Sequence, residues 1–549
     1  MIGFPELPEA TSWSAAREGF EWRLPAAYNI AWLISGRWAA ADPERTALIA
    51  LGPEGARRWS HREIWAASGR FANVLAAAGV GRGDRVAVLL PQSAETLICW
   101  LATIRLGAVI VPLFTLFGED ALAYRLADSG AKALLTDTAN LPKVAAIRER
   151  APDLVAVWQV EGPGAGAEGM PEAMARAREA APVAETGPDD PALLSYTSGT
   201  TGPPKGALHG QRVLAAHVVG ARMVYDFLPK PGDLMWTPAD WAWMGGSMNA
   251  MAPALYHGVP LVAHRMTKFD PERAFALMAA EKVTVAFFPP TALKLMRRAP
   301  DPRRFGAALR TVGSAGEAMG AEVLAWGREA FGLSINEYYG QTECNMLIGN
   351  NARLMRPKPG WTGMVMPGHE AAILGPDLVE RPWGKVGEIA IAAPDAGLFL
   401  GYWRNPEKTA EKLVTGPDGR RWLLTGDEGN RDAEGYFRFE SRTDDVITSS
   451  GYRVGPTEIE DCLAAHPSVA VAAVVGAPDP IRTEAIRAFV KLAPGAEGGD
   501  RAAAALIAHV RLRLSPHLAP VSVDFLDEIP VTATGKIMRR ELRARFTEG

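Results

Sequence analysis

The chain has 549 residues, of which 48% are hydrophobic and 22% charged, and its 58 basic and 62 acidic side chains give a formal net charge of -4. This composition is typical of a globular protein and excludes disorder, collagen and coiled coil, while the length indicates about three or four compact units. The near-neutral charge gives no electrostatic footprint for nucleic acid, and the densest basic run, residues 536–545, is best explained as a solvated helix face.

Cysteine content and the first residues indicate a cytoplasmic protein. The three cysteines, Cys99, Cys344 and Cys462, are too few for a disulfide framework and lack the paired spacing of zinc sites. The N-terminus carries acids and prolines where an export signal needs a basic start and an apolar run. Residues 241–264 contain no Asp, Glu, Lys or Arg, but their glycines and prolines favour buried core and loop over a membrane span.

Strands and helices alternate through the first two thirds of the chain. Hydrophobic patterning predicts a strand at 84–91, a helix at 93–107, and strands at 108–113, 132–137 and 283–290, the last followed by a helix. This alternation is typical of layered α/β sheets. From about Gly363, short segments such as 387–392 and 435–440 predict antiparallel strands in a barrel-like region. The last hundred residues predict a small α+β unit, with the joint near 441–445.

The sharpest local signal is the stretch LLSYTSGTTGPPKGALHG at residues 193–210. Hydroxyls, small residues and free backbone N–H groups next to a cation, here Lys205, suit the binding of a polyphosphate. The stretch is not a Walker A loop, because Lys205 follows Pro204 and precedes Gly206. Taken alone, it fits a flexible Ser/Gly loop equally well.

Further motifs follow in order: GSAGEAM at 313–319, NEYYGQTE at 336–343, LLTGD at 423–427, SRTDDVITSSGYRVGPTEIE at 441–460 and PVTATGKIMRREL at 530–542. Together with 193–210 they resemble the adenylate-forming superfamily of acyl-CoA synthetases, luciferases and peptide-synthetase adenylation domains. The resemblance covers nearly the whole chain. It implies a large α/β N-terminal domain with a β-barrel-like subdomain, residues 1–443, and a small mobile α+β C-terminal domain, residues 444–549.

The resemblance also implies a reaction and its residues. A carboxylate attacks the α-phosphorus of ATP, pyrophosphate leaves, and the thiol of coenzyme A then attacks the acyl adenylate. The residues matching the nucleotide and catalytic positions are Thr197, Ser198, Gly199, Thr200, Thr201, Gly202 and Lys205 for the β and γ phosphates, Gly316, Glu317 and Ala318 for adenine, Tyr339 stacked on its face, Gln341, Thr342 for the α-phosphate, Glu343 for Mg2+, Asp427 for the ribose hydroxyls, Arg442 for ribose or phosphate, and Lys536 for the α-phosphate and substrate carboxylate. Ser441 stands where the family usually has Gly.

For the second half-reaction, the resemblance implies that the C-terminal domain rotates about a hinge at Asp444. Rotation would withdraw Lys536 and bring Gly451 and Tyr452 alongside the pantetheine tunnel. Arg511 and Arg453 match contacts with coenzyme A phosphate and nucleotide phosphates, and Trp243 matches an aromatic near the acyl and thiol sites.

The sequence predicts the acid only loosely. Gly340 stands at a position that closes the acyl pocket with tryptophan in acetyl-specific members of the family, which favours medium-chain or branched acids; a backbone requirement for Gly340, with Trp243 or Met346 blocking the pocket, is the alternative. Three other functions stay open: loading of a carrier protein, an aromatic-acid CoA ligase, and a non-enzymatic nucleotide sensor. The spacing from Pro530 to Lys536 also resembles the target of lysine acetyltransferases.

Overall fold

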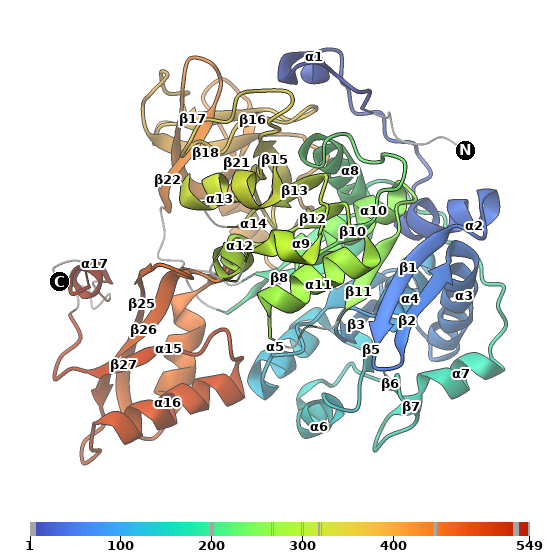
Figure 1. Ribbon diagram of the computed structural model, residues 1–549. Coiled ribbons are helices and arrows are strands. Elements are labelled where there is room, and N and C mark those ends of the chain that lie inside the picture. Colours follow the sequence, from blue (N-terminus) through green and yellow to red (C-terminus); the bar gives the residue numbers. More distant parts are fainter. Residues whose placement is uncertain are drawn as a thin grey trace.

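The computed structural model describes residues 7–197, 203–264, 266, 268–297, 299, 301–316, 319, 321–442, 447–530, 537 and 539–546. These residues form four sheets with helices packed on them (Figure 1). The helices are α1 (Trp13–Arg17), α2 (Arg37–Ala41), α3 (His61–Ala77), α4 (Ala94–Arg105), α5 (Glu119–Ser129), α6 (Leu141–Ala146), α7 (Met170–Arg176), α8 (Val213–Val224), α9 (Met244–Gly246), α10 (Ala252–Tyr256), α11 (Pro271–Glu281), α12 (Pro290–Arg297), α13 (Ala321–Phe331), α14 (Pro406–Lys412), α15 (Pro456–Ala464), α16 (Asp500–Arg513) and α17 (Arg539–Ala544), with π-helical turns η1 (Trp32–Gly36) and η3 (Ser247–Met251) and 3-10 turns η2 (Arg148–Arg150) and η4 (Pro302–Phe305).

Two large, mainly parallel sheets form the centre of the N-terminal part. The first, in the order β16-β15-β14-β13-β12-β10-β11-β1-β2, contains β1 (Thr46–Gly52), β2 (Gly55–Ser60), β10 (Met235–Trp236), β11 (Leu261–His264), β12 (Val285–Phe287), β13 (Thr311–Ser314), β14 (Asn336–Gln341), β15 (Asn345–Gly349) and β16 (Met364–Val365). The second, in the order β19-β9-β8-β4-β3-β5-β6-β7, contains β3 (Arg85–Leu89), β4 (Val109–Pro112), β5 (Ala131–Thr136), β6 (Ala156–Gln159), β7 (Glu168–Gly169), β8 (Pro191–Thr197), β9 (Lys205–Gly210) and β19 (Gly401–Tyr402).

Helices fill the space between these sheets and cover their outer faces. One apolar cluster joins α3, α4, α8 and α10 to strands of both sheets, while α11, α12 and α13 pack on the far face of the first sheet and α5 and α6 on that of the second. Strands covered on both faces are buried along their length, which explains the unbroken apolar run of β4.

The predicted alternation of strand and helix is confirmed. The strands expected at 84–91, 108–113, 132–137 and 283–290 are β3, β4, β5 and β12, and the helix expected at 93–107 is α4. Ser93 begins α4 by accepting a hydrogen bond from the backbone N–H of Thr96 at 3.2 Å, and the chain turns after it at Gly107, whose φ is +70°.

The two remaining sheets follow in chain order. The antiparallel sheet predicted after Gly363 has the order β17-β18-β21-β20, with β22 also on β21, and contains β17 (Ala371–Leu374), β18 (Gly387–Ala393), β20 (Leu413–Thr415), β21 (Arg421–Arg431) and β22 (Phe437–Arg442). The last sheet has the order β24-β23-β26-β25, with β27 also on β26, and contains β23 (Ile447–Ser449), β24 (Tyr452–Val454), β25 (Val469–Asp479), β26 (Thr483–Leu492) and β27 (Ser522–Phe525).

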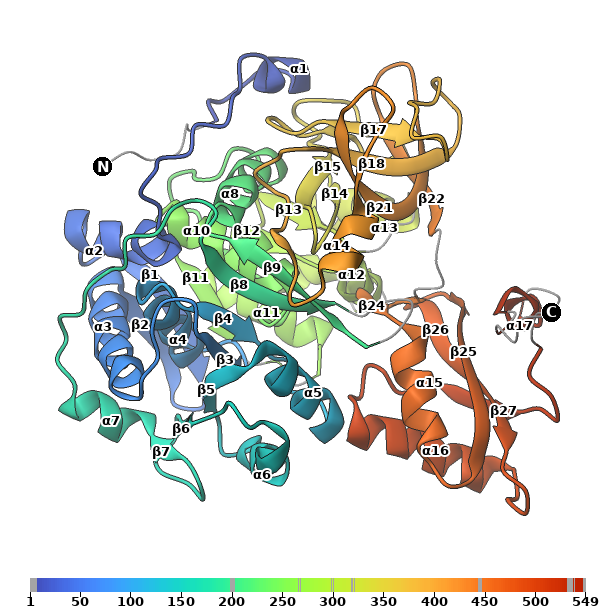
Figure 2. The ribbon, with the colours of Figure 1, turned by 180° about the vertical axis from the view of Figure 1, so that it is seen from behind.

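The C-terminal sheet and its helices form a lobe at one side of the molecule, next to α5 (Figures 1 and 2). Contact is made where the chain leaves α16: Arg513 Nε lies 2.7 Å from Asp120 Oδ2, and the backbone N–H of Gly118 donates to the carbonyl of Leu514. The boundary predicted at 443/444 lies outside the described residues, as does the hinge residue Asp444.

The apolar segment 241–264 folds into buried structure. It contributes α9, η3, α10 and β11 to the main core, as its glycines and prolines predict. Among the described residues, no helix has both the length and the apolar composition that a membrane span requires.

Candidate active site

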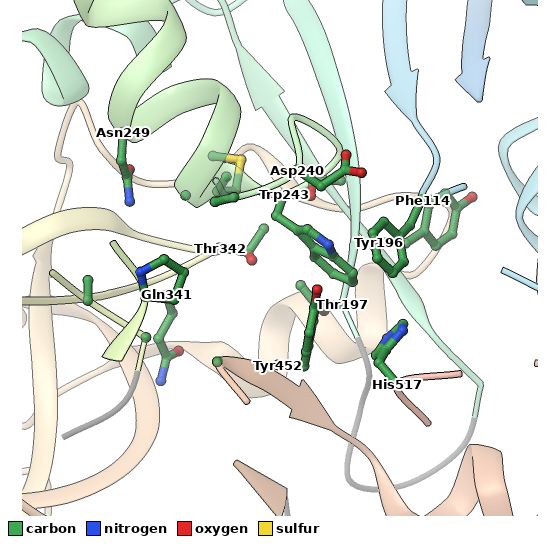
Figure 3. Close-up of a pocket in the computed structure, with 18 of the residues that line it drawn as sticks. Phe114, Tyr196, Thr197, Asp240, Trp243, Asn249, Gln341, Thr342, Tyr452 and His517 are labelled. Atoms are coloured by element: carbon green, nitrogen blue, oxygen red, sulfur yellow. The ribbon is translucent and has the colours of Figure 1, made fainter. Parts of the chain in front are cut away.

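A cavity of about 640 Å3 lies where the parallel strands of both large sheets end. Its wall includes residues that end or follow the strands β3, β4, β8, β10, β12, β13 and β14, the edge at which open α/β sheets bind ligands. The C-terminal lobe also contributes to the wall, through Ser450, Gly451, Tyr452, Glu458, His517 and Leu518. Tyr452 and His517 are labelled in Figure 3. Both parts of the chain therefore contribute to one site.

Thr197 and Lys205, two of the predicted phosphate contacts, both line the cavity. Thr197 ends β8, Lys205 begins β9, and the two pair across this antiparallel connection, while the predicted Ser198, Gly199, Thr200, Thr201 and Gly202 lie outside the described residues. The ammonium of Lys205 lies 5.0 Å from the centre of the Tyr402 ring. Burial lowers the pKa of Lys205, and the nearby Glu343 carboxylate opposes that effect.

Thr342 and Glu343 lie on the same wall, just after β14. Glu343 Oε1 accepts a hydrogen bond from the Tyr402 hydroxyl at 2.7 Å, which holds the carboxylate beside Lys205. Described residues include no group of three or more His, Cys, Asp and Glu that could hold a metal alone. One carboxylate nevertheless fits Mg2+, because this ion takes most of its remaining ligands from phosphates and water.

Asp427 is almost fully buried, at 1% exposed, and is held by two side chains of the YYGQTE motif. Its Oδ2 accepts from the Tyr339 hydroxyl at 2.7 Å and from the amide of Gln341, which also donates to the Thr425 carbonyl at 2.9 Å. Gln341 and Thr425 line the cavity, whereas Tyr339 and Asp427 are not among the described residues of its wall. The stacking of Tyr339 on adenine stays a prediction.

The predicted adenine loop is described only in part. Gly316 lines the cavity with φ at +103°, and a Cβ built there would lie 3.6 Å from the carbonyl oxygen of Gly451. Glu317, Ala318, and the first-step lysine Lys536 lie outside the described residues. Arg442 pairs with Asp427 through the backbone of β22 and β21, and Arg453 lies on β24; their side chains are not described.

An aromatic cluster joins the two parts of the chain at the cavity. The rings of Trp243 and Tyr452 have centres 5.1 Å apart, and Tyr452 lies 4.4 Å from His517 (Figure 3). Phe114 packs on all three, at 5.5 Å from Trp243, 5.9 Å from Tyr452 and 5.2 Å from His517. Burial lowers the pKa of His517 to about 3, so this ring is neutral at pH 7.

Arg511 lies outside this cavity. It lines a second one of about 380 Å3, together with Arg482, Ser449, Ser450 and His517. Ser450 and His517 border both cavities. The coenzyme A contact predicted for Arg511 stays a prediction, and two arginines on one wall are consistent with phosphate binding.

Gly340 lies on the cavity wall, and its backbone gives a reason for glycine that is separate from the predicted pocket-floor role. A Cβ built there would lie 1.5 Å from the carbonyl oxygen of Asn345, and the pairing of β14 with β15 is irregular at this point. The pocket-floor role therefore competes with the backbone requirement, which the sequence alone left open.

Four residues that line the site were not identified by any sequence motif. Tyr402, His517, His217 and Asn249 all line the cavity, yet they come from segments without a recognisable motif. Only the fold brings these residues to the same place as the motif residues.

Comparisons with known proteins agree with this geometry. Residues 36–403 match the AMP-binding enzyme family, and residues 458–536 match the AMP-binding enzyme C-terminal domain. The chain belongs to the AMP-binding enzyme family. Its class is that of the acyl-CoA synthetases, which are AMP-forming acid–thiol ligases.

Individual relatives cover nearly all of the chain. The mitochondrial acyl-coenzyme A synthetase ACSM3 of Mus musculus is 34% identical over 97% of this chain and 93% of its own. The acetyl-coenzyme A synthetase of Bacillus subtilis (strain 168) is 34% identical over 92% and 88%. The crystal structure of a Brucella canis acyl-CoA synthetase superposes with a TM-score of 0.70 at 34% identity, over 95% of both chains.

Proposed function

We propose that this enzyme activates a medium-chain or branched carboxylic acid with ATP and transfers the acyl group to coenzyme A. The observation that supports this most directly is that one cavity contains Lys205, Thr342 and Glu343 together with an apolar wall. Phe287, Ala292, Leu295, Met244 and Met346 contribute to that wall. Its volume of about 640 Å3 is in the range of pockets that enclose a small molecule.

In the first step, a carboxylate oxygen bonds to the α-phosphorus of ATP while the bond to pyrophosphate breaks. Lys205 offsets negative charge on the leaving phosphates, and the Thr342 hydroxyl donates to the α-phosphate. Glu343 would hold Mg2+, which would neutralise phosphate charge. Groups fixed before the reaction stabilise developing charge most effectively, and the Tyr402 hydrogen bond fixes Glu343 in this way.

In the second step, the sulfur of coenzyme A bonds to the acyl carbonyl carbon, the thiol proton is lost, and AMP leaves. Gly451 and Tyr452 stand at the cavity beside Trp243. This placement supports assigning the present orientation to thioester formation, with the C-terminal domain beginning at 444 and turning about Asp444. Arg511 and Arg482 are offered as contacts for coenzyme A phosphates at the second cavity.

Lys536 is expected to act in the first step only, so its substitution distinguishes the two steps. Lys536→Ala should all but abolish adenylate formation from acid and ATP, lowering its rate by about a hundredfold to a thousandfold. Thioester formation from a preformed acyl adenylate should largely survive, because the lysine is withdrawn in that step. Single-turnover assays of each half-reaction measure the contrast. Equal loss in both would remove the two-orientation account.

The enzyme class is tested by pyrophosphate release from a panel of acids with and without coenzyme A. Release that depends on free coenzyme A, with straight and branched medium-chain acids ahead of acetate and benzoate, is the expected result. Acceptance of only a phosphopantetheinylated carrier protein would favour the carrier-loading alternative, and preference for benzoate would favour an aromatic-acid ligase. No release with any acid would favour a nucleotide sensor.

Acetylation of Lys536 would cancel its charge and mimic Lys536→Ala. Incubation with acetyl-CoA and a lysine acetyltransferase, followed by mass spectrometry and an adenylation assay, tests this regulation. An unmodified, fully active enzyme would count against it. We also assign the enzyme to the cytoplasm, which agrees with three buried cysteines that form no disulfide.

A further inference from the structure

A polar patch interrupts the apolar wall of the cavity beside Gly340. It consists of His217 on α8, Asn249 on η3 and Asn345 on β15, which are 1%, 9% and 4% exposed. The Asn345 carbonyl oxygen is the atom nearest to a Cβ built at Gly340, so the patch adjoins the predicted acyl pocket. Alkyl chains alone do not require such groups, since burying amides and imidazoles in an apolar wall is costly.

Hydrogen bonds fix the protonation of this patch. The amide nitrogen of Asn345 donates to the Gly397 carbonyl, which leaves its Oδ1 as an acceptor 2.7 Å from His217 Nε2. His217 Nε2 therefore carries the proton. Burial lowers the pKa of His217 to about 4, although the neighbouring amides of Asn345 and Asn249 oppose that effect, so the ring is neutral at pH 7.

Asn345 has an unusual backbone for a buried residue with a side chain. Its φ is +63°, in the left-handed region that few residues other than glycine adopt. The two hydrogen bonds of its side chain hold it there. The left-handed backbone thus fixes the Asn345 amide within the polar patch, and such backbone conformations are commonly found at ligand sites.

Asn249 is the member of the patch that we place in contact with a ligand. Its side chain extends from the helix on the side of the cavity where Gln341 lies (Figure 3). Burial lowers the pKa of His217 and raises that of Tyr338, and the nearby Asn249 amide opposes both shifts, which places it next to both side chains. A primary amide has two donors and an acceptor carbonyl, so it can serve a ligand oxygen as well as its neighbours.

The charge of this region limits what it can bind. The described wall residues from α8, η3, β14 and β15 include no Lys or Arg. A second carboxylate of the substrate would therefore be buried without a cation, which is strongly unfavourable. A neutral oxygen, such as a hydroxyl or ketone, meets no such penalty.

We propose that the acid carries a neutral hydrogen-bonding oxygen on its acyl chain and that Asn249 recognises it. This inference rests on the proposed function and names a substrate class within it, a medium-chain hydroxy or oxo acid. A site built to hydrogen-bond an oxygen discriminates strongly against the analogue without it, because its own polar group then stays unpaired.

The test compares matched acids in the purified full-length enzyme. Hexanoate is compared with 5-hydroxyhexanoate and 5-oxohexanoate, octanoate with its 7-hydroxy and 7-oxo forms, and adipate serves as the dianion. The readouts are kcat/KM for coenzyme-A-dependent pyrophosphate release and thioester yield. At least one hydroxy or oxo acid should exceed its parent by about tenfold or more, and adipate should be the poorest substrate.

Asn249→Leu, which keeps the size of the side chain, should lower the ratio of kcat/KM for the oxygenated acid to that for the parent acid by about tenfold to a hundredfold, because only the oxygenated acid loses a hydrogen-bond partner. Leu295→Met, on the apolar wall, is the matched control and should leave the ratio unchanged. Thermal midpoints and ATP affinity establish that both variants are folded.

Two results would overturn the inference while the proposed function stands. In the first, parent acids form thioesters as well as any oxygenated acid does. In the second, Asn249→Leu lowers kcat/KM for all acids by the same factor, as substitution of a purely structural residue would. Thioester formation from no acid in either series would overturn the proposed function itself, and the inference with it.

Discussion

Arg125 and Glu458 form a buried ion pair between the N-terminal part and the C-terminal lobe. Arg125 Nη1 lies 3.5 Å from Glu458 Oε1, and the two side chains are only 4% and 9% exposed. Arg125 also packs on the Phe117 ring, with its guanidinium carbon 4.1 Å from the ring centre. Both charged residues line the cavity, so the pair depends on the lobe being docked as it is here.

Reversing one charge should therefore act on the docked orientation. Glu458→Lys should slow thioester formation from a preformed adenylate by about tenfold to a hundredfold, because an uncompensated buried charge costs several kcal/mol. Adenylate formation should change much less if it uses another orientation. Single-turnover rates of both half-reactions measure the difference. The charge-swapped double variant Arg125→Glu/Glu458→Arg is the control and should recover part of the loss; equal slowing of both steps would contradict this role.

Substitution of Asp427 should raise the KM for ATP more than the KM for the acid. Asp427→Asn removes the charge that accepts from Tyr339 and Gln341 and leaves an amide N–H facing those donors. We expect the KM for ATP to rise about tenfold to a hundredfold, with a small change in the KM for the acid. Tyr339→Phe removes one of the two donors and should cost about fivefold. A selective effect on the acid would show that Asp427 does not serve the nucleotide.

Five buried histidines predict a loss of stability in mild acid. Burial lowers the pKa values of His61 and His217 to about 4, and those of His209, His257 and His517 to about 3. The unfolded chain protonates these rings below about pH 6.5, whereas the folded chain does not, so unfolding takes up protons. The contribution of these histidines to the free energy of unfolding should be constant above pH 6.5. It should fall as the pH decreases from 6.5 toward 4.

Urea midpoints at a series of pH values measure this dependence. His209→Leu is the informative variant, because neither ring nitrogen of His209 has a hydrogen-bond partner among the described residues. It should reduce the slope between pH 6 and 4 by up to about 1.4 kcal/mol per pH unit. A wild-type midpoint that does not change between pH 6.5 and 4.5 would contradict the prediction.

Motif residues could be predicted to meet because they lie at strand ends that share one edge. Thr197, Lys205, Thr342 and Glu343 accordingly lie in one cavity. His517 and Asn249 could not be found in this way, because their positions depend on how a lobe docks and how a π-helical turn faces the cavity. No local pattern of residues encodes either arrangement.

Gly340 was singled out by its motif, but its backbone contact could not be predicted from the sequence. Its motif predicted a missing side chain at the floor of the acyl pocket. The contact with the Asn345 carbonyl depends on the irregular pairing of β14 and β15 and on the positive φ of Asn345, and neither can be read from the residue types.

The two explanations of Gly340 predict different outcomes for Gly340→Ala. If the backbone requirement dominates, as we expect, the Cβ displaces the Asn345 carbonyl and lowers stability by about 2 kcal/mol or more, and activity falls by a similar factor for acetate, butyrate and hexanoate. Gly340→Trp should then fail with every acid. Gly245→Ala is the matched control, since its Cβ would meet only the Phe287 ring, at 2.9 Å, on the same cavity wall. It should lower stability less than Gly340→Ala does, because a side-chain ring can shift more easily than a paired backbone carbonyl, and it should lower the preference for longer acids. A stable Gly340→Ala enzyme that turns toward acetate and propionate would instead establish Gly340 as the floor of the pocket.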